Sequence, residues 1–164
     1  MESKLILESH LTTVATASQK SKDDQRERVL ITGVSGFLGN HVCKIFLEDA
    51  TYKVRGSTTN PNNKAKRDGI RQACGDYLFE NELELVRVDL TQPDTVDKAV
   101  EGCQYVVHVA SPVPATMPVK ADEERLIRTA VDGTLNVLRS AMKHKVKRVV
   151  ITSSTAAIID RSKQ

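Results

Sequence analysis

Short apolar runs alternate with amphipathic segments along the chain from Arg28 onward. The apolar runs are rich in β-branched residues, which is typical of strands buried on both faces of a parallel sheet. We expect five strands, at residues 28–33, 52–58, 83–90, 103–112 and 146–154. The segments between them repeat apolar residues at helical spacing, which predicts four helices, at residues 36–50, 64–75, 91–102 and 121–143.

The alternation of strands and helices determines the fold class that we predict. Strands joined through helices pair in parallel, by right-handed crossovers. We therefore expect an α/β fold, a doubly wound parallel sheet of the Rossmann type with strand order 3-2-1-4-5. Ligands bind such sheets where the strand order reverses, which would be beside the first strand. Residues 1–27 are polar, and we interpret them as a mobile extension before a domain at residues 28–164.

Composition excludes several classes of function. Hydrophobic residues make up 40% and charged residues 27% of the 164 residues, as in soluble globular proteins. The small net charge of +3 and the aromatic content of 4% disfavour nucleic-acid binding. No apolar run approaches the roughly 20 residues that span a bilayer, and the N-terminal residues lack the features of a leader peptide. We therefore expect a cytoplasmic protein that binds neither membranes nor nucleic acid.

The cysteines and histidines do not have the spacing of a metal site or a disulfide framework. Cys43, Cys74 and Cys103 lie far apart, and no Cys-x-x-Cys pair occurs. We expect buried, reduced thiols and no metal. We interpret His108, inside an apolar run, as a core residue and not as a catalytic base.

A glycine-rich segment, ITGVSGFLGNH, joins the first expected strand to the first expected helix. Gly33 can adopt the backbone angles of a tight turn. Gly36 would let the main chain approach a diphosphate, which the amides and the dipole of the helix N-terminus would bind. Gly39 would let the helix pack closely on the sheet. The strand–loop–helix context favours a dinucleotide-binding loop.

Five motifs together resemble the extended short-chain dehydrogenases/reductases, the group of the NAD-dependent epimerases/dehydratases. They are TGVSGFLG at 32–39, VDL at 88–90, VHVASP at 107–112, VDGTLNVLRSA at 131–141 and KRVVITSSTAA at 147–157. Within this group the chain most resembles dihydroflavonol reductases, cinnamoyl-CoA reductases and methylglyoxal-type ketone reductases. The resemblance implies cofactor contacts from the glycine loop, from the VDL motif to adenine, and from the VHVASP motif to the ribose. The residues implied are Gly33, Ser35, Gly36, Phe37, Leu38, Gly39, Asp89, Leu90, Val109, Ala110 and Ser111.

The end of the second strand indicates which dinucleotide is preferred, because NAD enzymes place a carboxylate there on the ribose 2′-hydroxyl. This chain has no Asp or Glu between residues 55 and 67. Thr59 and Lys66 are our candidates to bind a 2′-phosphate, although the resembling reductases commonly have an arginine where this chain has Thr59. We expect NADP, with NAD as the alternative.

The resemblance also implies that a hydroxyl after the fifth strand contacts the substrate carbonyl. Ser154 is our first candidate and Ser153 the second. In the family a Tyr-x-x-x-Lys pair supplies the proton, because a nearby ammonium lowers the pKa of the tyrosine. The chain has no such pair: Gly56, Asn81 and Val109 stand four positions after its three tyrosines.

We therefore expect the chain to be the cofactor-binding half of an NADP-dependent oxidoreductase that reduces a ketone or aldehyde. The domain would be incomplete, without the later strands and the substrate lobe, and inactive alone. Two alternatives stay open. One is a non-catalytic dinucleotide-binding module, and the other is a fragment of a nucleotide-sugar epimerase/dehydratase. The substrate and the oligomeric state do not follow from the sequence.

Overall fold

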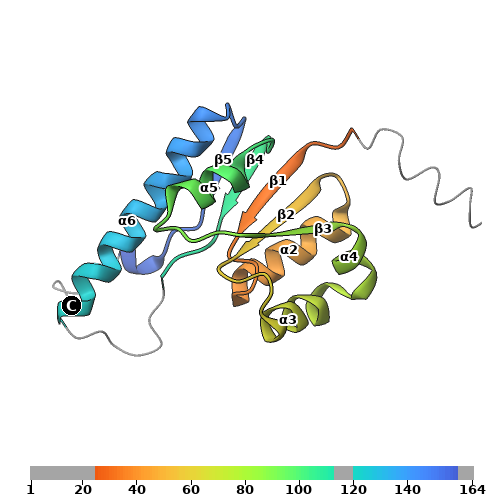
Figure 1. The fold of residues 1–164 in the computed structure, drawn as a ribbon, viewed down its shortest axis with the longest axis horizontal. Helices are drawn as coiled ribbons and strands as arrows, with labels where there is room; N and C mark the ends of the chain where they lie inside the picture. Colours follow the sequence, from red (N-terminus) through yellow and green to blue (C-terminus); the bar gives the residue numbers. More distant parts are fainter. Residues whose placement is uncertain (1–24, 113–119, 159–164) are drawn as a thin grey trace, which may run out of the picture.

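A computed structural model describes residues 25–112 and 120–158, which form a five-stranded parallel sheet (Figure 1). The strand order is β3-β2-β1-β4-β5, which confirms the α/β class and the predicted topology. The strands are β1 (Arg28–Thr32), β2 (Lys53–Thr58), β3 (Leu83–Arg87), β4 (Tyr105–His108) and β5 (Arg148–Ile151). The first 24 residues of the expected N-terminal extension lie outside the described part of the chain, and residues 25–27 lie within it.

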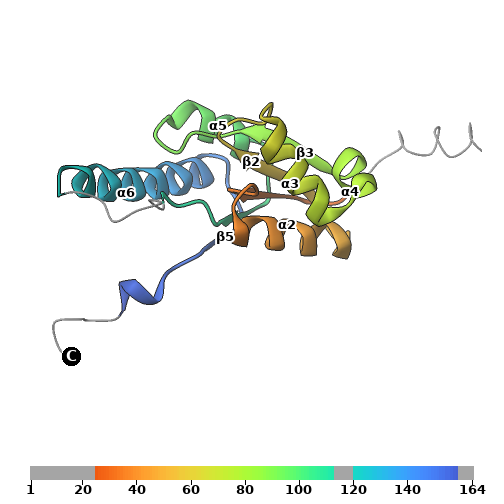
Figure 2. The same ribbon diagram turned by 90° about the horizontal axis from the view of Figure 1, so that it is seen from below.

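Helices cover both faces of the sheet, as Figure 2 shows. The helices are α2 (Phe37–Asp49), α3 (Lys64–Cys74), α4 (Asp76–Asn81), α5 (Pro93–Val100) and α6 (Lys120–Lys143). One face packs against α2, α3 and α4, and the other packs against α5 and α6. The strand order reverses between β1 and β4, so the crevice expected beside the first strand is present.

The alternation of side chains along β1 explains the two cores. Val29 and Ile31 point into a cluster with α2, α3 and α4, whereas Leu30 points into a cluster with α5 and α6. All three side chains are almost fully buried. The apolar run from which we predicted this strand is thus the centre of the fold.

Helix α4 is absent from our sequence expectations. It is six residues long, Asp76–Asn81, which is too short to establish a helical period. Gly75 separates it from α3 with a φ of 85°, which glycine adopts without strain. Phe79 anchors α4 in the core, and the guanidinium groups of Arg67 and Arg71 lie about 5 Å from its ring centre, at 5.0 and 4.8 Å.

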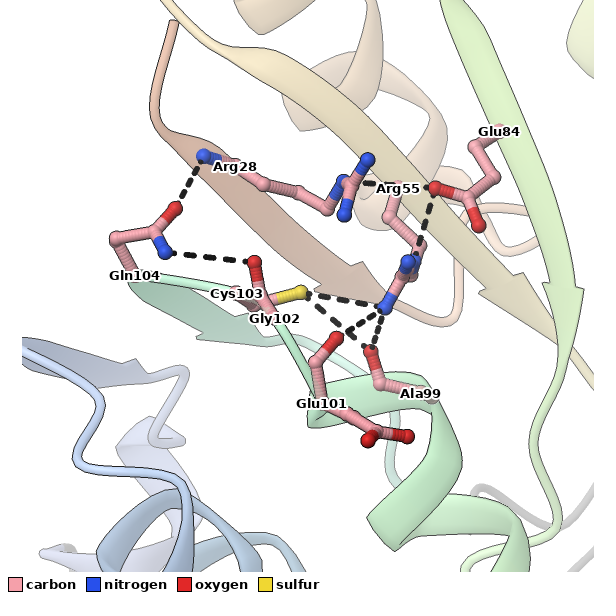
Figure 3. Close-up of polar contacts among 8 residues, drawn as sticks. All are labelled: Arg28, Arg55, Glu84, Ala99, Glu101, Gly102, Cys103 and Gln104. Atoms are coloured by element: carbon pink, nitrogen blue, oxygen red, sulfur yellow. Dashed lines mark hydrogen bonds and ion pairs between the residues drawn. The ribbon is translucent and has the colours of Figure 1, made fainter. Parts of the chain in front are cut away.

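Arg55, a buried residue of β2, fixes the end of α5 (Figure 3). Its Nη1 donates hydrogen bonds to the carbonyl oxygens of Ala99 and Glu101, both at 2.8 Å. Its Nε lies 3.0 Å from a carboxylate oxygen of Glu84 on β3. The guanidinium therefore satisfies carbonyls that the C-terminus of a helix leaves unpaired, and links α5 to the sheet.

The sheet is less well covered at its β5 edge. Val150 and Ile151 are 52% and 41% exposed, whereas the last four residues of β1 are buried. After β5 the chain leaves the body of the fold and forms a single 3₁₀ turn, Thr155–Ala157 (Figure 2). The fifth strand is shorter than expected, so Ser153 and Ser154 follow it instead of ending it.

Candidate functional site

A cavity of about 670 Å³ lies where β1, β2, β3 and β4 end. All of the residues that the sequence suggested as cofactor contacts line it. They are Gly33, Ser35, Gly36, Phe37, Leu38, Gly39, Thr59, Lys66, Asp89, Leu90, Val109, Ala110 and Ser111. Four segments that are distant in the sequence, those after β1, β2, β3 and β4, therefore meet in one pocket, at the switch point of the sheet.

The first turn of the glycine loop requires its glycine. Gly33 has a φ of 74°, which side chains disfavour. A Cβ atom there would also lie 3.0 Å from Cα and Cβ of Ala110. The glycine loop and the loop after β4 are thus in direct contact.

Gly39 and Gly36 serve different purposes. A Cβ on Gly39 would lie 2.2 Å from the carbonyl oxygen of Gly33, so this glycine packs α2 on its own loop and not on the sheet as we expected. Gly36 caps α2 with an ordinary φ of −88°, and a Cβ there would have one protein contact, at 3.4 Å. The backbone does not require glycine at position 36, and the open space beside it belongs to the cavity.

The N-terminus of α2 offers hydrogen-bond donors to the cavity. The first amide that donates within the helix is that of Asn40, to the carbonyl of Gly36 at 2.9 Å. The preceding amides, those of Phe37, Leu38 and Gly39, have no acceptor within the helix. Together with the positive end of the helix dipole they form an anion-binding position.

The end of β2 presents hydroxyls and an ammonium. Thr58 Oγ1 lies 3.1 Å from Ser35 Oγ, which joins β2 to the glycine loop. Lys66 Nζ donates to Thr59 Oγ1 at 2.6 Å, and the amide of Lys66 donates to the side chain of Asn63, the N-cap of α3. The capped helix therefore holds the exposed Lys66 ammonium beside the end of β2.

Asp89 is the acidic residue that lines the cavity, and it follows β3. Its Oδ1 accepts hydrogen bonds from the hydroxyl and the amide of Thr91, at 2.7 and 3.0 Å. These bonds lower the pKa of Asp89 below its usual value. Thr91 thus belongs to this turn, and Gln92 is the N-cap of α5.

Helix α6 fixes the neighbouring Leu90. Asn136 Nδ2 donates to the carbonyl oxygen of Leu90 at 2.9 Å. A Cβ on Gly133 would lie 2.9 Å from Cβ of Leu90, so glycine allows close packing of α6 at this point. The Asp89–Leu90 turn is thereby held from both sides.

Buried polar groups join β1 to the loop after β4. Thr32 Oγ1 accepts hydrogen bonds from the amides of Val109 and Ala110, both at 3.0 Å. The same oxygen lies 2.9 Å from Nδ1 of His108. His108 is buried, as expected of a core histidine, and burial lowers its pKa.

Six further residues line the cavity that we had not named as cofactor contacts from the sequence. They are Ser57, Thr58, Val88, Thr91, Pro112 and Thr129. Five of them adjoin residues that we had named, so extending each motif by one or two positions would have found them. Thr129 lies on α6 one turn before Gly133, and only the packing of α6 against Leu90 brings it to the site.

The two serines lie elsewhere. Ser153 and Ser154 are exposed, and neither belongs to the lining of the cavity. The amide of Thr152 still pairs with the carbonyl oxygen of His108 at 3.0 Å, so the sheet register ends just before the serines. The structure therefore assembles the expected cofactor contacts, but it does not bring the serines to them.

Metal and membrane features can be assessed in the same residues. Within residues 25–112 and 120–158, no three His, Cys, Asp or Glu side chains form a group that could hold a metal ion. Among the helices of that part of the chain, none is long and apolar enough to cross a bilayer. All three cysteines are buried and free, and burial raises the pKa of Cys43 to about 12.

Comparison with known proteins identifies relatives that are longer than this chain. It is 39% identical over 137 residues to tetraketide alpha-pyrone reductase 1 of Arabidopsis thaliana, which covers 83% of this chain and 40% of the relative. It is 35% identical over 138 residues to dihydroflavonol 4-reductase of Callistephus chinensis, covering 84% and 36%. The crystal structure of vestitone reductase from alfalfa superposes with a TM-score of 0.61 at 31% identity, covering 80% and 37%.

The chain thus spans about two fifths of the length of these relatives. The profile of one family, described as the NAD dependent epimerase/dehydratase family, matches residues 29–164. This chain belongs to the NAD dependent epimerase/dehydratase family.

Proposed function

We propose that this chain binds a nicotinamide dinucleotide, preferring NADP, as the cofactor-binding part of a reductase that converts a ketone or aldehyde into an alcohol. One observation carries the proposal: the expected cofactor contacts from four separate segments of the chain line a single cavity. When bound, the cofactor supplies a hydride to the carbonyl carbon. The names of the relatives, all reductases, support this class of reaction.

The residues of the cavity fit such a cofactor. The open space at Gly36 and the first amides of α2 would accept the diphosphate. The Asp89–Leu90 turn, held by Thr91 and α6, would contact the adenine. The segment Val109–Ser111 would pass the ribose on the nicotinamide side.

The preference for NADP rests on the charge at the end of β2. Lys66 and Thr59 line the cavity there, and the carboxylate that would favour NAD is absent from the β2 end. The next residue, Asn60, is not assigned to the 2′-phosphate. Its Oδ1 accepts the amide of Asn62 at 3.0 Å, which closes its own turn, and it is not a lining residue. Thr59 and Lys66 are therefore the residues that we assign to the 2′-phosphate.

Turnover would need groups beyond those of the cavity. We propose that Ser154, or else Ser153, contacts the substrate carbonyl in the active enzyme. The 164 residues contain no Tyr-x-x-x-Lys pair to protonate the alkoxide, and a general acid contributes about 10²–10⁴-fold in rate. A non-catalytic dinucleotide-binding module is the second candidate, favoured by the exposure of both serines.

A calorimetric titration with NADPH and NADH tests the shared part of both candidates. We expect the 164-residue chain to bind dinucleotide and to oxidise no NADPH when aldehydes or ketones are added. A chain that binds neither dinucleotide would contradict both candidates. Steady NADPH oxidation would contradict the second candidate and our view that the missing Tyr-x-x-x-Lys pair is required.

The preference for NADP has its own test. Lys66→Ala should weaken NADPH binding about tenfold, or 1.4 kcal/mol, because a charged hydrogen bond to phosphate is lost. The affinity for NADH should not change. Lys64→Ala is the matched control, because Lys64 lies on the same helix, pairs with Asp68 and does not line the cavity. Equal losses for NADPH and NADH would move the 2′-phosphate position away from Lys66.

A further inference from the structure

The contact between Thr32 and His108 has a direction that hydrogen-bond chemistry determines. A hydroxyl group offers one proton and two acceptor positions. Thr32 Oγ1 uses both acceptor positions for the amides of Val109 and Ala110. Its proton must therefore go to Nδ1 of His108, 2.9 Å away. His108 is thus an acceptor at Nδ1, which makes it a neutral imidazole with its proton on Nε2.

The direction of this hydrogen bond matters because Thr32 and His108 directly precede residues that form two walls of the cavity. Thr32 is the residue before Gly33, and His108 is the residue before Val109. The two residues are direct neighbours across β1 and β4. Gly33, Val109 and Ala110 all line the cavity, and the Gly33 backbone lies against Ala110. The hydroxyl of Thr32 therefore holds the loop after β4 against the glycine loop.

We propose that His108 is a positioning residue for dinucleotide binding, whose neutral imidazole orients the Thr32 hydroxyl so that it fastens the Val109–Ala110 loop against the glycine loop. This role rests on the proposed dinucleotide-binding function. A proton on Nδ1 would present a third donor to an oxygen that already accepts two. The Thr32 proton would lose its acceptor, and at least one loop amide would lose its bond.

The surroundings of His108 keep it neutral. Its neighbours across the sheet, Thr32 on β1 and Ile151 on β5, carry no charge. Burial is the cause that lowers its pKa. Because a buried cation without a partner is unfavourable, protonation of His108 at acid pH should be coupled to loosening of the loop.

Two pairs of variants test the role through binding of NADP⁺. Thr32→Val keeps the shape but removes the hydroxyl, and we expect about tenfold weaker binding. Thr32→Ser keeps the hydroxyl and should bind within about threefold of the wild type. His108→Leu removes the acceptor and should weaken binding about tenfold. His108→Asn can place an amide oxygen near the position of Nδ1 and should restore most of the affinity.

The pH profile separates positioning from a merely structural role. Affinity of the wild type should fall more steeply than that of His108→Asn, which has no imidazole, as the pH is lowered below about 6.5, because burial holds the pKa of His108 below that ordinary value. The ligand's own 2′-phosphate also titrates near pH 6, but this contribution is common to both proteins and cancels in the ratio. Amide exchange of Ala110 in the ligand-free chain should be faster in Thr32→Val than in Thr32→Ser.

The outcomes can be told apart. Equal affinity of Thr32→Val and Thr32→Ser, or identical pH profiles of wild type and His108→Asn, would overturn the role of His108 alone. A wild type that binds no dinucleotide would overturn the proposed function and this role together. If His108→Leu does not fold, the pair of Thr32 variants still decides the question.

Discussion

β1 and β5 are parallel strands of one sheet, yet the chain that follows each of them meets different surroundings. β1 is buried and leads into the glycine loop, which Ala110 and α2 enclose. β5 has Val150 and Ile151 half exposed and leads into the exposed serines. The contrast shows that the cavity is assembled by adjacent β–α units within the described residues. Ser153 and Ser154, the expected catalytic hydroxyls, are not among the residues that line it.

Replacing Gly36 by valine should change dinucleotide affinity far more than any change in the segment after β5. The φ of −88° suits valine, so the fold should persist, but the side chain would occupy the place proposed for the diphosphate. We expect dinucleotide affinity to fall at least about 100-fold, or 2.7 kcal/mol, by calorimetry. Ser154→Ala, at the other region, should leave the affinity unchanged.

Gly69→Val is the control for the valine side chain itself. Gly69 lies on α3, and a Cβ there would meet nothing within 4 Å. The Gly69→Val variant should bind dinucleotide with the affinity of the wild type. If Gly36→Val retained full affinity, the cavity beside β1 would not be the dinucleotide site, and the contrast between the two strands would lose its functional meaning.

The free energy of unfolding should also depend more on the buried β2 side of the sheet than on β5. Arg55→Met removes the guanidinium that donates to the carbonyls of Ala99 and Glu101 and so leaves the carbonyl of Ala99 with only the weaker Cys103 Sγ donor. We expect the free energy of unfolding to fall by about 3 kcal/mol in urea titrations, because buried polar groups are costly to leave unpaired. Val150→Thr, a change of similar shape on β5, should cost less than about 0.5 kcal/mol. Similar losses from both changes would show that β5 is as well packed as β2.

The sequence predicted most of this architecture because short runs rich in β-branched residues alternate with segments of helical period. The five strands, their order and the four longer helices follow from that pattern and from the chirality of crossovers. Helix α4 could not be predicted, since six residues carry no clear period and Gly75 looks like a simple stop. The ends of β3 and β4 were placed too late, because apolar residues continue beyond the hydrogen-bonded part of each strand. The end of β5 was also placed too late, since the prediction extended it through the hydroxyl residues at 152–154.

The candidate site was predictable as a set of residues and not as a set of contacts. The motifs indicated which segments line the cavity, because each follows a strand at the same edge of the sheet. The partner of Gly39 and the position of Thr129 depend on how helices pack. The bond between Thr32 and His108 joins residues 76 positions apart, which a local pattern does not reveal. The cofactor role of the lining residues stays a prediction.

The smallest expected effect concerns how α6 is held beside β5. Asp97 on α5 accepts hydrogen bonds from three groups at the end of α6: Lys143 Nζ at 2.7 Å, His144 Nε2 at 3.0 Å and Ser140 Oγ at 3.2 Å. The bond from Lys143 is the largest cause that lowers the pKa of Asp97. A depressed carboxyl pKa stabilises the fold above the unfolded value, near pH 4, and this contribution is lost as the pH falls through the folded value.

The β5 side should therefore loosen in acid before the β1 side does. We expect amide exchange in α6 and β5, corrected for intrinsic rates, to accelerate relative to β1 and α2 between pH 6 and pH 3. Asp97→Asn keeps the shape without the charge and should remove this dependence, whereas Asp132→Asn, an exposed residue of α6, should preserve it. The change should be small, since Lys143 is exposed and salt screens the pair. Equal acid sensitivity in both regions would mean that apolar packing, and not this clamp, holds α6 in place.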